Sequence, residues 1–246
     1  MPNCIMTVEL LAPKYLTWMA NGLLMTAWIA VIAIVFSTLA GFTLALARDA
    51  KKPVWRLLAR CYTLVFRNTP LLIQLFFWYF AAPNLLPENT MLWLNTPHPL
   101  NLAGCTLGWP SFEFLAGTFG LTLYATAFVA EDIRSGIRGV PKGQYEAAAA
   151  SGLTRWQMQR HVILPQALRH ALSPLFGQYM NIVKNSSLTM GIGLAELSYT
   201  SRQVEAASFL TFQAFGVATL GYIGLIAILD VLARQVQQRV ALPAGN

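Results

Sequence analysis

Charged side chains are scarce in this 246-residue sequence, at 11% of all residues, whereas soluble globular domains carry about 25%. Hydrophobic residues make up 56% of the chain, and its mean hydropathy is +0.51. This composition excludes an ordinary soluble domain and predicts an integral membrane protein.

Motifs for catalysis and for metal binding are also missing. The sequence has no Gly-x-x-x-x-Gly-Lys phosphate loop, no nucleophile elbow and no His-Glu-x-x-His. Its three cysteines and three histidines lack the spacing of metal ligands. We therefore expect no catalytic residue, no metal site and no cofactor in this chain.

Long apolar runs predict five transmembrane helices, because about 20 apolar residues are needed to cross a bilayer. The predicted spans cover about residues 23–47, 61–82, 114–130, 171–194 and 209–229. Residues 1–21 are expected outside the bilayer or along its surface, and residues 195–208 are expected to be a short polar connection. Residues 83–112 are expected to form a loop, with five prolines and no lysine or arginine. The predicted fold is an all-α membrane protein with a single transmembrane domain over residues 1–246.

Basic residues are concentrated in alternate connections between the predicted spans. The turn at 48–60 holds five, the loop at about 134–170 holds six and the C-terminal tail holds two of the 17 lysines and arginines. Because basic loops stay in the cytoplasm, we expect the N-terminus outside, the C-terminus inside and the 134–170 loop in the cytoplasm. This segregation explains the net charge of +7 and argues against nucleic-acid binding.

The longest charged segment, from Pro141 to Pro165, is predicted to form two short helices with a bend. Pro141 suits a first helical turn, and the alanine-rich run after it favours a helix that ends at a left-handed Gly152. Thr154 and Gln157 have the spacing of a capping box, and Pro165 is expected to mark the next break. On composition alone, the segment is either a docking knob for a cytoplasmic partner or an ordinary amphipathic surface loop.

This segment resembles the EAA signature of ABC importer permeases. The match runs Glu-Ala-Ala from Glu146, then Gly152, then Leu164 and Pro165, with Val162 where the signature usually has isoleucine. The resemblance implies a coupling helix that inserts into a cleft of an ATPase subunit. The residues to which it gives this role are Glu146, Ala147, Ala148, Gly152, Leu153, Leu164 and Pro165.

Other segments extend the resemblance over nearly the whole chain. Residues 66–72, 130–144 and 183–193 contain motifs similar to those of polar amino acid permeases, and residues 78–88 resemble the glutamate/aspartate subgroup. The resemblance implies the type I ABC importer permease fold, in the bacterial inner membrane, and a transport subunit that is not itself an enzyme. The implied substrate is glutamate or aspartate, and glutamine, histidine and arginine remain alternatives.

The resemblance also implies a set of partners. ATP and Mg²⁺ would be bound by a separate ABC ATPase dimer. A second permease, identical or homologous, would complete the translocation path, and a periplasmic binding protein would deliver the amino acid. The remaining partner is membrane lipid.

Two basic residues, Arg67 and Lys184, fall within predicted spans, where a charge costs about 2.5–3.5 kcal/mol on insertion scales. In one interpretation they line the substrate path and attract carboxylates. The alternative is that they pair with Glu131, Asp132 or backbone carbonyls and fix the packing. The candidate path residues are Arg67, Asn68, Lys184, Asn185 and Ser187.

Glu196, at the outer end of the fourth predicted span, is assigned to an outer gate or to the contact with the binding protein. An intramembrane enzyme, supported only by the buried charges, and a passive channel remain as alternative functions. Neither of them explains the spacing of the EAA signature.

Overall fold

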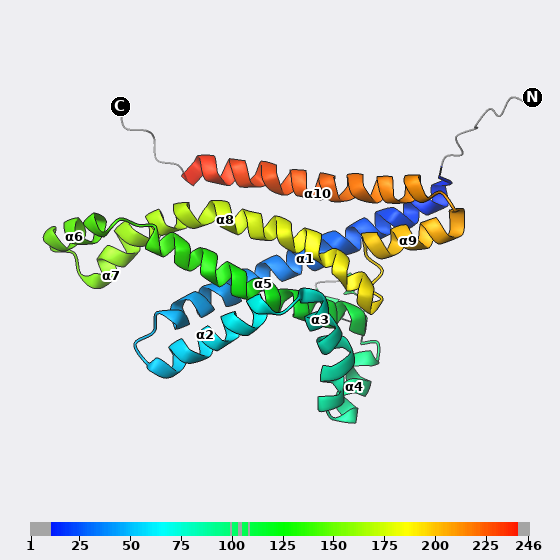
Figure 1. The fold of residues 1–246 in the computed structure, drawn as a ribbon, viewed down its shortest axis with the longest axis horizontal. Helices are drawn as coiled ribbons and strands as arrows, with labels where there is room; N and C mark the ends of the chain where they lie inside the picture. The colour runs from blue at the N-terminus through cyan, green and yellow to red at the C-terminus, as the bar shows by residue number, and fades with distance from the viewer. Residues whose placement is uncertain (1–10, 99, 103–104, 108, 241–246) are drawn as a thin grey trace, which may run out of the picture.

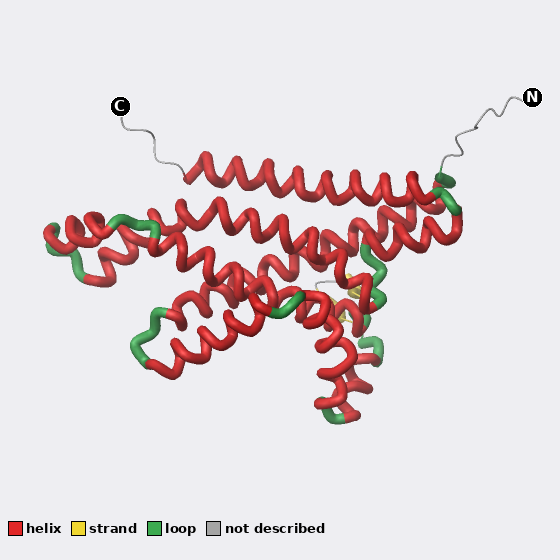
Figure 2. The backbone as a smooth tube through the Cα atoms, in the orientation of Figure 1, coloured by secondary structure: helices red, strands yellow, loops and turns green. Residues whose placement is uncertain are grey.

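The computed structural model describes residues 11–98, 100–102, 105–107 and 109–240. Its longest helices run along the length of the molecule, and almost all of the described chain is helical (Figures 1 and 2). The long helices are α1 (Pro13–Arg48), α5 (Phe112–Arg138), α8 (Leu164–Asn185) and α10 (Thr211–Val240). The shorter helices are α2 (Pro53–Asn68), α3 (Leu71–Phe76), α4 (Glu88–Asn95), α6 (Lys142–Ala150), α7 (Arg155–Met158) and α9 (Leu197–Ser208).

By length and composition, three of the described helices are apolar enough to cross a membrane: α1, α5 and α10. These three correspond to the first, third and fifth predicted spans. The first is longer than predicted, because α1 already begins at Pro13, inside the segment expected outside the bilayer or along its surface.

The central core joins α1, α3, α5 and α8 through buried apolar side chains such as Ile29, Leu75 and Leu121. Helices α5 and α8 also approach each other closely at Gly136. A Cβ atom at this position would lie 2.5 Å from the carbonyl oxygen of Ala167 and 2.7 Å from the Cβ of Ala171. Small residues therefore set the distance between these two helices, as is common for helices packed in membranes.

The second predicted span, residues 61–82, is wrong as a single helix. The chain is extended at Thr69 (φ −109°, ψ 138°), between α2 and α3. Pro70 explains the break, because a proline disfavours the helical conformation of the residue before it. The Gln74 amide donates hydrogen bonds to the backbone oxygens of Phe66 (3.0 Å) and Thr69 (3.1 Å). These bonds satisfy two carbonyls at the interruption.

Pro165 does not break the chain, contrary to the prediction. Residues Gln159–Ile163 form a turn of π-helix, in which the N–H of Leu164 donates to the carbonyl of Gln159. Helix α8 then continues directly, with Pro165 in its first turn. A wide turn accommodates a proline, which has no N–H and crowds the carbonyl four residues earlier.

Two predicted connections contain regular structure. Residues 83–112 include α4 and an antiparallel hairpin of β1 (Leu100–Leu102) and β2 (Cys105–Leu107), so the fold is not purely helical. Most of residues 195–208 form helix α9. Glu196 caps the N-terminus of this helix, and the apolar side of α9 packs on α1 and α10.

Candidate functional site: the coupling segment and the intramembrane charges

Helices α6 and α7 lie at one end of the molecule, beyond the ends of α5 and α8 (Figure 1). The turn between α1 and α2 and the end of α10 lie toward the same end, whereas α9 and the start of α1 lie at the other. The three most basic segments of the sequence therefore share one end of the structure.

The bend between α6 and α7 has the predicted left-handed glycine. Gly152 has a φ of +75°, which favours glycine because a Cβ atom is strained in this region. Its N–H donates to the carbonyl of Ala149 (3.0 Å), and the N–H of Leu153 donates to that of Ala148 (3.3 Å). This pair of hydrogen bonds is a Schellman motif, which satisfies the last carbonyls of α6.

The predicted capping box at the start of α7 is confirmed. The N–H of Gln157 donates to the Thr154 hydroxyl (3.3 Å), and the N–H of Thr154 donates to Oε1 of Gln157 (2.9 Å). Both ends of the bend are thus fixed by local hydrogen bonds. The segment is thus a defined pair of helices, as predicted.

A small core holds α6 against the start of α8. Val140, Ile163 and Ala167 are buried there, with Tyr145 and Met158 packed against them. The face of α6 that carries these contacts is turned toward the protein. On the opposite face of α6, Glu146 and Ala147 are exposed.

The predicted coupling residues differ in exposure. Glu146, Ala147, Gly152, Leu164 and Pro165 are exposed, Leu153 is half-buried and Ala148 is buried.

Ala148 therefore anchors α6 within the chain and does not present a side chain to a partner. Sequence reasoning missed Trp156, whose side chain is 71% exposed on α7. A lone tryptophan in the most charged segment was the available signal, because exposed aromatic residues are enriched in interfaces.

Glu131 is the centre of an ion-pair network at the base of the coupling segment. Its Oε1 lies 3.0 Å from Nη1 of Arg48 and 3.3 Å from Nη1 of Arg134, and its Oε2 lies 3.4 Å from Nη2 of Arg138. Arg134 also pairs with Asp49 at 3.0 Å. This network ties the end of α1 to α5, next to the start of the coupling segment.

The predicted pairing of Arg67 and Lys184 with Glu131 is therefore wrong. In the part of the chain that the structure describes, neither basic side chain has an ion pair within 4.0 Å or a hydrogen bond. Arg67 instead lies over the ring of Phe128, 5.3 Å from its centre, in a cation–π contact. Both cations are exposed in the single chain.

Asp132 also makes no ion pair among the described residues. Its Oδ2 atom is buried and has no hydrogen-bond partner there, although Arg67 is close enough to attract the carboxylate electrostatically. The candidate path residues do not form one cluster in this structure. Asn68 donates to the carbonyl of Leu64 (2.7 Å) and Ser187 to that of Lys184 (2.7 Å), so each is bonded within its own segment.

Glu196 is fully buried, which contradicts a direct contact with a binding protein. Its carboxylate accepts hydrogen bonds from the N–H groups of Ser198 (3.0 Å) and Tyr199 (2.9 Å), and from the Tyr222 hydroxyl (2.6 Å). Burial raises the pKa of the Glu196 carboxyl above its ordinary value, and these hydrogen bonds act in the opposite direction. The residue links the N-terminus of α9 to α10 and, through Thr26, to α1.

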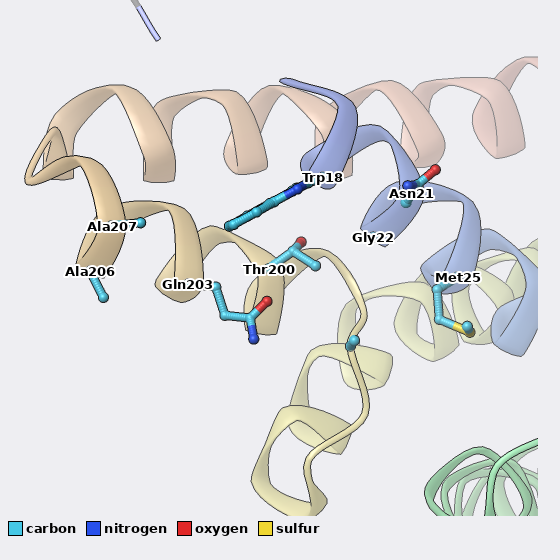
Figure 3. A pocket seen from close by; sticks show the side chains of 9 residues that line it. Trp18, Asn21, Gly22, Met25, Thr200, Gln203, Ala206 and Ala207 are labelled. Atoms are coloured by element: carbon cyan, nitrogen blue, oxygen red, sulfur yellow. The ribbon is translucent and has the colours of Figure 1, made fainter. Parts of the chain in front are cut away.

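A hollow of about 730 Å³ lies between α1 and α9 (Figure 3). These parts of the two helices lie at the end of the molecule opposite α6 (Figure 1). Figure 3 shows Trp18 reaching from α1 toward α9, with Asn21 and Met25 on α1 and Thr200 and Gln203 on α9. The side chains that line it are uncharged. It offers amide and hydroxyl groups but no charged partner for a ligand.

Comparison with protein families identifies the chain. The model described as "Binding-protein-dependent transport system inner membrane component" matches residues 37–242. The chain belongs to this family. The permease therefore has an EAA segment in the context that the sequence resemblance predicted, and that resemblance is confirmed.

Curated relatives specify the kind of permease. The chain is 32% identical over 232 residues to the glutamate/aspartate import permease protein GltJ of Escherichia coli (strain K12), covering 94% of this chain and 90% of that one. It is 33% identical to the probable glutamine ABC transporter permease protein GlnM of Bacillus subtilis (strain 168), with coverages of 96% and 98%. It is 34% identical to the probable amino-acid ABC transporter permease protein PatM of Vibrio harveyi, with coverages of 89% and 88%.

Solved structures share the fold. A crystal structure of an amino acid ABC transporter with histidines superposes with a TM-score of 0.75 at 28% identity, covering 92% of this chain and 95% of that one. An inward-facing MetNI methionine ABC transporter has a TM-score of 0.73 at 17% identity, with coverages of 94% and 100%, and supports the fold alone. The chain is thus an integral membrane permease of an amino acid ABC importer. Its relatives are transport subunits, which argues against an intramembrane enzyme.

Proposed function

We propose that this permease imports glutamate or aspartate, and that ATP hydrolysis in a separate subunit drives the import through residues 141–165. The observation that carries the proposal is the pair of helices α6 and α7. They form an exposed, hydrogen-bonded knob that joins the ends of two long helices, α5 and α8. A force applied to this knob would reach both helices.

The proposed topology has five membrane-spanning segments, with the N-terminus outside and the C-terminus in the cytoplasm of a bacterial inner membrane. Helices α1, α5 and α10 are three of the spans, and α2–α3 and α8 complete the path of the chain across the bilayer. The clustering of the basic turn, the coupling segment and the end of α10 at one end of the molecule supports this orientation.

The proposed mechanism requires an ATPase dimer that binds one permease conformation more tightly than another. A partner that bound both conformations equally well would not change the equilibrium between them. Glu146 and Ala147 face the ATPase cleft, and Gly152 fixes the bend that presents them. The Leu164–Pro165 pair lies where α7 passes into α8, so motion of the knob would tilt α8. ATP and Mg²⁺ belong to the ATPase, and this chain holds no cofactor.

The other proposed partners follow from the direction of transport. A periplasmic binding protein delivers the amino acid to the outer end, and a second permease, identical or homologous, completes the path. Neither Arg67 nor Lys184 makes an ion pair within 4.0 Å among the described residues, although Asp132 is close enough to attract Arg67 electrostatically. Both cations are exposed and so remain available to a ligand.

The proposed path attracts the carboxylates of the substrate with Arg67 and Lys184, while Asn68, Asn185 and Ser187 supply uncharged polar groups. A second candidate substrate is glutamine, because relatives of equal similarity carry that name. An acidic side chain provides a second carboxylate for the second cation, which favours glutamate or aspartate over glutamine.

The test is ATP-driven uptake in proteoliposomes that contain the permease, the ATPase and the binding protein. Lys184→Gln removes one cation from the path, and we expect glutamate uptake to fall about tenfold, since a charge-assisted hydrogen bond contributes roughly 1.5 kcal/mol or more. Lys14→Gln is the matched control, because Lys14 lies near the start of α1 against the Tyr15 ring. Unchanged glutamate uptake and unchanged preference over glutamine in Lys184→Gln would contradict the proposed path.

A further inference from the structure

A second cavity, of about 670 Å³, lies between α1, α2 and α5. Four charged side chains line it: Arg48, Arg60, Arg67 and Glu131. With three cations and one carboxylate, the cavity has an excess of two positive charges. Such an excess in a partly apolar setting favours binding of an anion.

The carboxylate in this cavity does not neutralise the excess. Glu131 already shares its two oxygens among Arg48, Arg134 and Arg138. Arg60 has no ion pair with any described residue, and neither has Arg67. Arg48 and Arg60 are also close enough to repel each other. The cavity thus presents the unpaired guanidinium group of Arg60, which is suited to phosphate because its planar donors match the phosphate oxygens.

Apolar side chains lie beside these arginines in the same cavity. Leu57 and Leu64 line it and are 62% and 66% exposed. Leu58 and Val65, which are also on α2 but do not line the cavity, are exposed as well. Contact with leucine side chains does not stabilise the binding of a small water-soluble anion. An anionic lipid, in contrast, needs both a cationic site for its headgroup and an apolar surface for its acyl chains.

We propose that this cavity binds an anionic phospholipid, with Arg60 donating hydrogen bonds to the phosphate diester and the acyl chains lying on Leu57 and Leu64. Arg60 of α2 then lies at the level of the lipid headgroups. The bound lipid would neutralise the repulsion between Arg48 and Arg60. The inference depends on the position of the chain in a membrane and not on its substrate, so its failure leaves the proposed import of amino acids untouched.

The experiment titrates the purified permease in neutral detergent with dioleoyl phosphatidylglycerol, and in parallel with dioleoyl phosphatidylcholine, and measures bound lipid by native mass spectrometry. Wild-type protein should retain phosphatidylglycerol in preference to phosphatidylcholine. Arg60→Gln should bind phosphatidylglycerol about tenfold more weakly, as expected for one lost charge-assisted contact. Arg56→Gln is the matched control, because Arg56 is one turn away on the same helix and does not line the cavity.

Two further measurements separate a lipid from other anions. A Leu64→Asn variant should also weaken phosphatidylglycerol binding, and this variant keeps the proposal testable if Arg60→Gln does not fold. Inorganic phosphate and L-glutamate, each added in excess, should not displace the lipid.

The proposal is overturned if Arg60→Gln and Arg56→Gln bind phosphatidylglycerol equally, or if Leu64→Asn binds it as tightly as wild type. It is likewise overturned if phosphate or L-glutamate competes, because the cavity would then be a site for a free anion or for substrate.

Discussion

Replacement of Glu131 by glutamine tests whether the network at the base of the coupling segment holds α1 and α5 together. The side chains of Arg48, Arg134 and Glu131 are only 17%, 13% and 20% exposed. The Nε atoms of Arg48 and Arg134 are buried without a hydrogen-bond partner among the described residues. Both guanidinium groups therefore depend on their contacts with Glu131, and Arg134 depends also on Asp49.

The expected loss in the free energy of unfolding for Glu131→Gln is about 2 kcal/mol. Breaking a fully buried ion pair costs about 3–5 kcal/mol, and an exposed pair contributes about 0–1 kcal/mol. This network is mostly buried, but glutamine keeps neutral hydrogen bonds and Asp49 still holds Arg134, so the expected value lies between these limits. For a chain of this size the loss corresponds to a decrease in Tm of about 4–8 °C.

The assay is thermal unfolding of the purified permease in detergent, followed by intrinsic tryptophan fluorescence. Asp230→Asn is the matched control, because it removes the Asp230–Arg234 pair at 2.8 Å, whose side chains are 43% and 71% exposed. That change should leave Tm within about 1–2 °C of wild type. The reasoning is refuted if Glu131→Gln lowers Tm no more than Asp230→Asn does.

Three further substitutions test the geometry at other positions, each by Tm in detergent and by ATP-driven uptake. Gly152→Val should cost about 1 kcal/mol or more, because valine is strained at positive φ, and should reduce uptake, whereas the helical control Gly143→Ala should do neither; equal effects would contradict the role of the bend. Gly136→Val should cost about 3 kcal/mol through overpacking, whereas Gly224→Ala, with open space around it, should be neutral; a stable Gly136→Val would show that α5 and α8 are not packed this closely. Glu196→Gln should cost about 1–3 kcal/mol by weakening a buried cap, and an unchanged Tm would contradict its role in joining α9 to α10.

Local signals in the coupling segment predicted its structure well. The left-handed Gly152 and the capping box of Thr154 each involve residues that are only three or four positions apart in the sequence. The spacing of these residues is therefore enough to predict their hydrogen bonds. The break at Thr69 was missed for a different reason. The apolar run of residues 61–82 continues on both sides of Pro70, so its length predicts one span, although the residue before a proline rarely stays helical.

Features that depend on distant residues were not predictable from spacing. Glu131 pairs with Arg48, which lies 83 positions earlier, and not with Arg67 or Lys184. Glu196 is buried and accepts a hydrogen bond from the hydroxyl of Tyr222, 26 residues later. Neither contact leaves a periodic signal in the sequence, since each depends on how the long helices pack against one another.

The central claim is that residues 141–165 couple the permease to an ATPase, and site-directed crosslinking tests it most directly. Ala147 is exposed on α6, and Ala147→Cys in a variant without its three native cysteines provides a single attachment point there. The variant is mixed with the ATPase subunit and a short thiol-to-amine crosslinker, and crosslinked permease is measured on gels. Gln203→Cys, on α9 at the other end of the molecule, is the control. We predict a permease–ATPase adduct from position 147 and none from position 203; no adduct from position 147, or equal adducts from both positions, would contradict the account.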